Sequence, residues 1–171
     1  CKNLTRLDIT QNNIETLNIT QNLKLWWLFC DENKLLSLDL MNNRKLAKLS
    51  CHNNKLSSLD LSNNLELKVL HCWANALKEL DITKNLKLKY LDCRANHLEK
   101  LDVYNNMELV GTWCVDNNLE NIDVSCNKKL KILCCDRNVS PYFGDNEMRL
   151  GDYMCMNGEG ELIEVHGYEP L

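Results

Sequence analysis

The chain has 171 residues, of which 44% are apolar, and its formal net charge is −4. This acidic balance argues against nucleic acid or an anionic membrane as the main partner, because both require clustered Lys and Arg, and it leaves room for them only at a local patch. No apolar stretch approaches the roughly 18 to 20 residues that a transmembrane helix needs. The composition is that of a folded domain with a sizeable apolar core.

The dominant pattern is a repeat of 21 residues that runs from the first residues to about Asn138. The copies read L-x-x-L-x-C-x-x-N-x-L-x-x-L-D-[LIV]-[ST]-x-N-x-x and open on Leu4, Leu25, Leu46, Leu67, Leu88, Leu109 and Leu130. A short fixed period predicts a solenoid in which each unit packs on its neighbours. We therefore expect one repeat array over residues 1–138, with six full coils and a partial seventh.

Each copy contains two short segments in which apolar and polar residues alternate with the period of two typical of half-buried strands. In the second copy these segments are Leu28–Cys30 and Leu38–Leu40. Stacked coils would pair equivalent strands in parallel, about 4.8 Å apart. The pattern predicts a mostly β solenoid with short parallel strands on two faces and little or no α-helix.

Two asparagine positions follow the strands. The first column is Asn12, Asn33, Asn54, Asn75, Asn96, Asn117 and Asn138, and the second is Asn22, Asn43, Asn64, Asn85, Asn106 and Asn127. An inward amide can donate and accept, so we expect both columns to satisfy buried turn backbone rather than to bind a ligand.

The copy LAKLSCHNNKLSSLDLSNNLE, from Leu46 to Glu66, fits the motif at every defining position. This motif resembles the leucine-rich repeat family and, more narrowly, its nested bacterial class, the IRREKO type of Bacteroidetes-like bacteria. The resemblance implies a recognition or structural module in a secreted or cell-surface bacterial protein, and therefore an extracytoplasmic location. It identifies no ligand, because the motif contains scaffold positions only. Thr112 departs from the pattern at a Leu position and is expected to weaken the sixth coil.

Six of the ten cysteines recur with the coil, and Ile9 takes the equivalent position in the first copy: Cys30, Cys51, Cys72, Cys93, Cys114 and Cys135. A position that accepts Ile is apolar, so these thiols are predicted to be buried and unreactive. Neither disulfides nor zinc is favoured, because adjacent side chains point the same way and no C-x-x-C pair occurs. Cys126 and Cys134 fall on outward positions and are predicted to be the more reactive thiols, whereas the redox state of Cys1 and Cys155 stays open.

The second segment presents a row of aspartates on one face: Asp39, Asp60, Asp81, Asp102 and Asp123. We interpret them as acceptors for turn amides or for the Ser or Thr two residues on. Cation binding is the alternative, but calcium needs six to eight oxygens, and carboxylates on a flat face supply too few. No metal or cofactor is expected.

The outward positions of the first segment have no consensus and collect aromatic and basic side chains. Exposed aromatics and Arg are typical of interfaces, and this is the face on which leucine-rich repeat proteins usually bind. The candidate partner-binding residues are Trp27, Phe29, His52, His71, Trp73, Tyr90, Arg94 and Trp113. We favour the interpretation that these residues bind a protein partner. The alternatives are a glycan stacked on the same aromatics, a structural cell-envelope or adhesion module, and aromatics covered by an N-terminal cap or the C-terminal tail.

Ser50, His71 and Asp92 occupy the same outward position in three successive copies, in the order of a hydrolytic triad. A hydrolase also needs an oxyanion hole and a site that excludes water, which an open sheet face lacks. We therefore predict that the chain is not an enzyme.

The two ends of the chain depart from the repeat. The chain begins at Cys1 in the middle of a copy, which leaves open an upstream cap or leader. After Asn138, Pro141 is expected to stop the coil because it cannot donate to a ladder. Residues 139–171 are predicted to form a C-terminal cap, with a β-hairpin over Tyr153–Val165.

Overall fold

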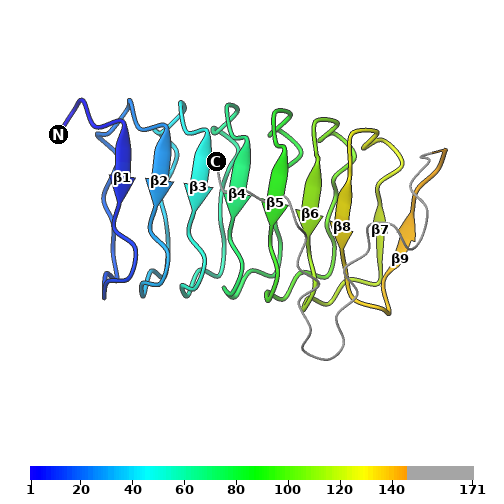
Figure 1. Ribbon diagram of the computed structural model, residues 1–171. Coiled ribbons are helices and arrows are strands. Elements are labelled where there is room, and N and C mark those ends of the chain that lie inside the picture. Colours follow the sequence, from blue (N-terminus) through cyan, green and yellow to red (C-terminus); the bar gives the residue numbers. More distant parts are fainter. Residues whose placement is uncertain (146–171) are drawn as a thin grey trace.

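The computed structural model describes residues 1–145 as a single solenoid of stacked coils (Figure 1). Its strands are three residues long, and no helix occurs among the described residues. The strands are β1 (Arg6–Asp8), β2 (Trp27–Phe29), β3 (Lys48–Ser50), β4 (Val69–His71), β5 (Tyr90–Asp92), β6 (Gly111–Trp113), β7 (Asn121–Asp123), β8 (Ile132–Cys134) and β9 (Ser140–Tyr142). The hairpin predicted over Tyr153–Val165 lies outside the described residues.

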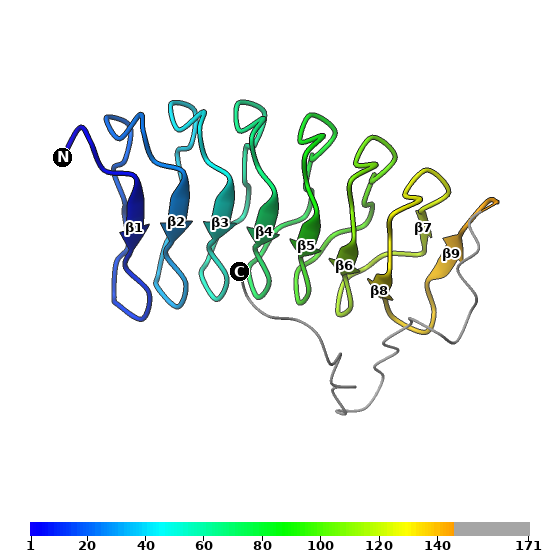
Figure 2. The same ribbon diagram turned by 45° about the horizontal axis from the view of Figure 1, so that its top comes forward.

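The first segments of the coils form one parallel sheet of seven strands in the order β1-β2-β3-β4-β5-β6-β8. Every pairing keeps the 21-residue offset, so that Leu28 lies beside Leu49 and Leu49 beside Leu70. Figures 1 and 2 show these strands side by side, with the second segments of the coils running behind them. The predicted β solenoid with parallel strands is confirmed.

Columns of identical or similar side chains fill the space between the two sides. Leu28, Leu49, Leu70 and Leu91 are fully buried, as are the leucines that open coils two to six. Thr112 continues the Leu91 column in β6, where it pairs in register with Leu91 and Leu133. It is 1% exposed, and its hydroxyl oxygen has no hydrogen-bond partner among the described residues.

The second side differs from the prediction of strands in every coil. Among residues 1–145, strands on this side occur only at β7 and β9, which pair in parallel. In the earlier coils an aspartate side chain accepts a hydrogen bond from the backbone amide two residues later in its own coil, as Asp39 does from Met41 at 3.0 Å. The same bond at Asp123, from the amide of Ser125 at 2.9 Å, leaves β7 paired with β9, so this bond alone does not exclude a ladder. Side chains supply part of the bonding between coils on this side, as Asn43 does to the carbonyl of Ile19.

Strand β9 lies beyond the predicted end of the array at Asn138. Its Pro141 pairs in register with Ile122, and Val124 donates its amide to the carbonyl of Tyr142 at 2.9 Å. Proline is tolerated because β9 is an edge strand of the two-stranded sheet, where the missing donor breaks no further pairing. The sequence suggests that Pro141 stops the coil, but the described chain continues through it as strand β9. The domain boundary at residue 138 stays a prediction.

The two asparagine columns tie each coil to the one before it in different ways. In the first column the amide is used fully: Asn54 accepts from the amide of Leu35 at 3.0 Å and donates to three carbonyls, including that of Cys30 in the previous coil. In the second column Asn64 donates to the carbonyls of Leu40 and Asn43. The oxygens of this column have no partner among the described residues: Asn43, Asn64, Asn85, Asn106 and Asn127.

One turn residue in each of the first six coils adopts a left-handed backbone without being glycine. The residues are Gln11, Glu32, Asn53, Ala74, Ala95 and Asp116, with φ between 49° and 57°. A side chain in this conformation costs roughly 1 to 2 kcal/mol. The cost is offset because the amide of the left-handed residue itself bonds to the next coil, as Glu32 does to the carbonyl of His52 at 3.0 Å.

The six recurring cysteines are buried free thiols, as predicted. Three of them, Cys30, Cys93 and Cys114, donate to backbone carbonyls of the next coil, with Cys114 donating to the carbonyl of Cys134 at 3.2 Å. The prediction for Cys134 was wrong: it points outward yet is only 2% exposed, because a short side chain beside the bulky Trp113 in register is sheltered. Cys126 is half-buried, so it keeps the access that the sequence predicts.

Thiol alkylation tests the cysteine column. Burial raises the pKa of Cys51, Cys72 and Cys93 far above the usual thiol range, and that of Cys135 to about 11. Iodoacetamide at mildly alkaline pH should leave these thiols unmodified in the folded chain and modify them in guanidinium, as read by peptide mass spectrometry. Cys126 is the internal control. Labelling of Cys72 at the rate of Cys126 would contradict the buried column.

The substitution Thr112→Val should stabilise the fold by about 1 kcal/mol, because it removes a buried hydroxyl without a partner at little change in volume. The urea midpoint of unfolding measures this change. Thr83→Val is the matched control, since its hydroxyl donates to Asp81 at 2.6 Å on the surface, and it should not stabilise the chain. An unchanged or lower midpoint for Thr112→Val would show that the hydroxyl is satisfied.

Candidate functional site

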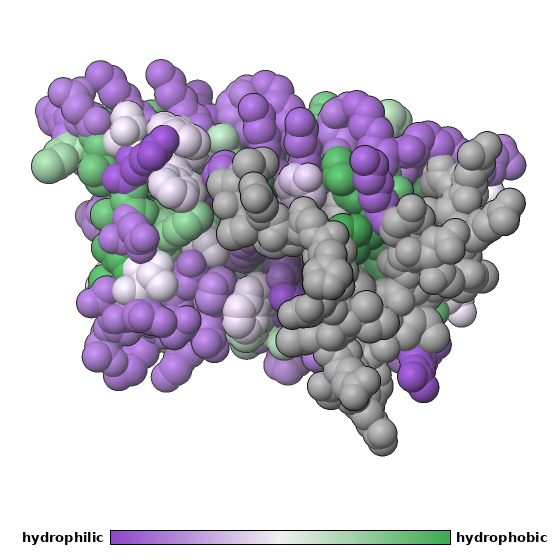
Figure 3. All heavy atoms as spheres, in the orientation of Figure 1, coloured by the Kyte–Doolittle hydropathy of each residue, from purple (hydrophilic) through white to green (hydrophobic). Residues whose placement is uncertain are grey.

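The candidate site is the outward face of the seven-stranded sheet, here called the first-strand face. It consists of the outward side chains of β1–β6 and β8 and of the residue two positions after each strand. All eight predicted partner-binding residues lie on it, but they are half-buried rather than fully exposed. Figure 3 shows side chains of intermediate hydropathy over β1 and β2, between more hydrophilic edges.

An aromatic group occupies the N-terminal part of this face. The rings of Trp26 and Trp27 stack with centroids 6.1 Å apart, and Phe29 meets Trp27 edge-on at 4.5 Å. The guanidinium of Arg6 lies over both tryptophans, 4.8 and 4.9 Å from the ring centroids. Lys48 approaches Trp27 from the next coil, 5.9 Å from the ring centroid. These cation–π contacts fix the rings before any partner arrives.

A continuous chain of contacts crosses the middle of the face through four coils. Asp31 accepts the backbone amide of His52 at 3.0 Å, and its carboxylate lies 3.6 Å from the His52 ring nitrogen. The His52 ring stacks on Trp73 with centroids 4.1 Å apart and planes inclined by 13°. Arg94 lies over Trp73 at 5.8 Å.

The same arginine closes the chain with a bidentate ion pair. Arg94 donates to the two carboxylate oxygens of Asp92 at 2.9 and 2.7 Å. His52 belongs to the coil before Trp73 and Arg94 to the coil after it, so Trp73 is held between a neighbour on either side. We call these five residues the Asp31–Asp92 chain. Two of its members, Asp31 and Asp92, were missing from the predicted site, although both stand at outward positions of the repeat.

Burial perturbs the titratable groups on this face. Burial raises the pKa of Asp31, although the hydrogen bond from Ser50 and the nearby His52 act to lower this pKa. It also lowers the pKa of His71 despite the nearby carboxylate of Asp92. Burial thus favours the neutral form of the His71 imidazole. Arg94 contributes a permanent positive charge to the Asp31–Asp92 chain.

Trp113 lies flat along its own strand because Gly111 leaves room for it. A Cβ atom on Gly111 would stand only 2.7 Å from the outer edge of the Trp113 ring and 3.4 Å from Tyr90. The absence of a side chain at this outward position is thus a packing requirement of the aromatic neighbours. This requirement is visible in the sequence, since Gly111 is the sole glycine within residues 1–138.

Ser50, His71 and Asp92 are neighbours in register, as their spacing predicts. Their contacts are not those of a catalytic triad. Ser50 is 3% exposed and its hydroxyl bonds to Asp31, while both carboxylate oxygens of Asp92 bond to Arg94. A triad needs the aspartate to orient the histidine, and here that carboxylate is committed to the guanidinium.

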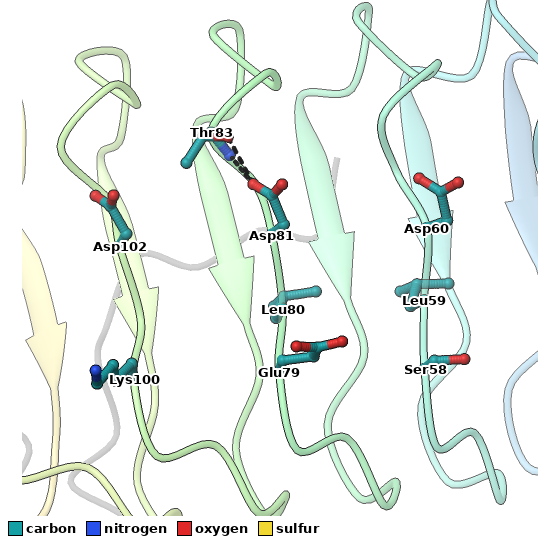
Figure 4. Close-up of a pocket in the computed structure, with 9 residues that line it drawn as sticks. All are labelled: Ser58, Leu59, Asp60, Glu79, Leu80, Asp81, Thr83, Lys100 and Asp102. Carbon is teal, nitrogen blue, oxygen red and sulfur yellow. Dashed lines mark hydrogen bonds between the residues drawn. The ribbon is translucent and has the colours of Figure 1, made fainter.

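The opposite side of the solenoid carries a hollow of about 610 Å³ lined by the aspartate row. Figure 4 shows Asp60, Asp81 and Asp102 in a line on successive coils, with Thr83 bonded to Asp81. Each of these carboxylates accepts the amide two residues on, at 2.9 Å. The interpretation of the row as turn acceptors is confirmed, and within residues 1–145 no group of His, Cys, Asp or Glu is placed to hold a metal ion.

The aspartate row predicts a loss of stability in acid. Hydrogen bonds from Ser62, Thr83 and Ser125 lower the pKa of Asp60, Asp81 and Asp123. A lowered folded-state pKa contributes stability that is present above the unfolded value of about 3.9 and is lost as the pH falls through the folded value. The melting temperature should therefore fall below about pH 4.

The variant with Asp60→Asn, Asp81→Asn and Asp123→Asn should lose less of its melting temperature in acid than the parent. Asn18 shows that an amide oxygen can fill this role, since it accepts from the amide of Thr20 at 3.2 Å. The control exchanges exposed carboxylates for amides at Glu79, Glu99 and Glu120 and removes the same charge. Equal acid sensitivity of both variants would refute the role of the turn bonds.

Comparisons with known proteins agree with this fold. No protein-family model and no curated protein matches the chain. Among solved structures, the functional domain of InlJ from Listeria monocytogenes, described as including a cysteine ladder, is 26% identical with a TM-score of 0.56. That alignment covers 87% of this chain and 46% of the InlJ chain.

Two further structures show the likeness of fold alone. An internalin, InlF, from the same bacterium is 18% identical with a TM-score of 0.77, over 91% of this chain and 48% of its own. A leucine-rich repeat protein from Leptospira interrogans is 20% identical with a TM-score of 0.62, over 81% of this chain and 45% of its own. The chain thus spans about half the length of each of these three structures.

The coil period, the parallel sheet and these neighbours show that the chain has the fold of leucine-rich repeat solenoids. Such neighbours support a recognition or protein-interaction module in general. No helix long and apolar enough to cross a membrane occurs among residues 1–145.

Proposed function

We propose that this chain is a non-enzymatic recognition module that binds a protein partner through the first-strand face. The observation that carries the proposal is the Asp31–Asp92 chain, in which charged and aromatic side chains from four coils hold one another in place. Side chains that are fixed in advance lose little entropy on binding, and Trp and Arg are the residues that most often dominate binding energy. The proposed contact residues are the eight predicted ones.

Ring stacking within the face favours a protein over a glycan. A sugar ring binds by lying on an open aromatic face, but Trp73 has His52 stacked against it and Arg94 over its ring. Trp27 is contacted by Arg6, Lys48 and Phe29 in the same way. Ring edges and charged heads are left for contact, and these suit the mixed polar surface of a protein.

We also propose an extracytoplasmic location in a bacterium, which rests on the family resemblance. The cysteine column is compatible with an oxidising compartment, because its thiols are buried and their pKa values are raised. Thiols held in this way are protected from exchange.

The partner is best sought by capture with the intact chain, followed by titration of the purified partner. The double variant Trp73→Ala and Trp113→Ala should weaken its affinity at least about tenfold, because it removes two central aromatic anchors. Tyr104→Ala is the matched control, since this tyrosine is 52% exposed and lies off the face. Circular dichroism and thermal melting confirm that each variant folds.

Two outcomes would contradict the proposal. Unchanged affinity of the double variant would place the binding surface elsewhere. Quenching of Trp fluorescence by free oligosaccharides, lost in the same double variant, would assign the face to a glycan.

A further inference from the structure

The turns that lead from the second side back to the first strands carry an unusual set of exposed apolar side chains. These return turns span residues 20–24, 41–45, 62–66, 83–87, 104–108 and 125–129, and they form the upper edge of the molecule in Figure 1. Six of the eight large apolar residues strongly exposed within residues 1–145 lie in them: Leu23, Met41, Leu65, Leu86, Tyr104 and Met107. None of these side chains belongs to the first-strand face.

The same turns, together with Lys2 of the incomplete first coil, concentrate positive charge. They contain eight basic residues against two acidic ones: Lys2, Lys24, Arg44, Lys45, Lys84, Lys87, Lys128 and Lys129 against Glu66 and Glu108. The other described residues hold 11 basic and 16 acidic groups. Both glutamates are already paired, Glu66 with Lys87 at 2.6 Å and Glu108 with Lys129 at 2.5 Å. The edge is therefore strongly basic on an acidic chain.

The geometry of the solenoid places these side chains in straight lines on a protruding rim. Leu65, Leu86 and Met107 occupy the same position in three consecutive coils, and a parallel sheet spaces such positions about 4.8 Å apart. Lysines occupy neighbouring positions, as Lys84 and Lys87 do around Leu86. A rim of this form cannot enclose a small ligand, but it can lie against a flat surface.

We propose that the return turns bind an anionic lipid surface. Apolar side chains that insert among headgroups and flanking lysines that pair with acidic lipids together define a peripheral membrane site. Each basic residue near such a surface adds to binding, and lysine stems reach past the apolar atoms to the headgroups. The site is separate from the first-strand face and does not depend on its function.

Vesicle sedimentation with the full chain tests the proposal. The chain should pellet with phosphatidylcholine vesicles that contain phosphatidylglycerol, should remain in the supernatant with phosphatidylcholine alone, and should be released by high salt. The double variant Lys84→Glu and Lys87→Glu should weaken partition at least about tenfold. Leu86→Ser with Met107→Ser should also weaken it, through lost insertion.

Matched control variants lie on the opposite turns. Lys34→Glu with Lys55→Glu reverses two exposed lysines, and Leu36→Ser removes a leucine that is 63% exposed, and both should leave partition unchanged. Absence of binding to anionic vesicles, equal binding to neutral ones, or equal losses in the control variants would each overturn the proposal. Self-association that Leu86→Ser with Met107→Ser abolishes, without vesicle binding, would assign the edge to a second copy of the chain instead.

Discussion

The fold depends on one constraint, which is that backbone groups turned into a narrow coil must be satisfied by the neighbouring coil. From Asn33 to Asn117, the first Asn column meets this requirement with four hydrogen bonds per amide, as Asn54 does between Leu35 and the carbonyls of Cys30, Cys51 and His52. Because these bonds connect positions 19 and 24 residues apart, they work only if every coil has the same length. The strict period of the sequence follows from this bonding, and so do the columns of leucine and cysteine.

The constraint does not act on the outward positions. Two outward surfaces carry side chains that differ from one coil to the next. The first-strand face gathers aromatic, acidic and basic side chains that contact one another across coils. The return turns gather exposed leucine, methionine and lysine side chains. A scaffold with fixed interior columns can thus carry two surfaces of different chemistry, one preorganised and one projecting, without a change to its core.

The period predicted the interior almost completely, because leucine, cysteine and asparagine positions depend on geometry that is the same in every coil. The period does not predict the side-chain burial and turn conformations that depend on the identity of particular neighbouring residues. The burial of Ser50 and Cys134 is decided by taller side chains in adjacent strands, and the left-handed turn at Ala74 carries no glycine to reveal it. The outward placement of Trp73 and Arg94 could be predicted, but their contact with each other could not, since side-chain contacts across coils have no signature in one sequence.

The Asp31–Asp92 chain joins residues that are close in space only because they are 21 apart in sequence. Insertion of one more 21-residue coil would leave the fold intact, because each coil packs only on its neighbours. Placed between His52 and Trp73, however, a coil that carries neither of these side chains would separate the two stacked rings by a full strand spacing and leave each beside a new neighbour. The number and order of the coils therefore determine which side chains meet on the first-strand face, and gain or loss of a single coil changes that face while the core columns stay the same.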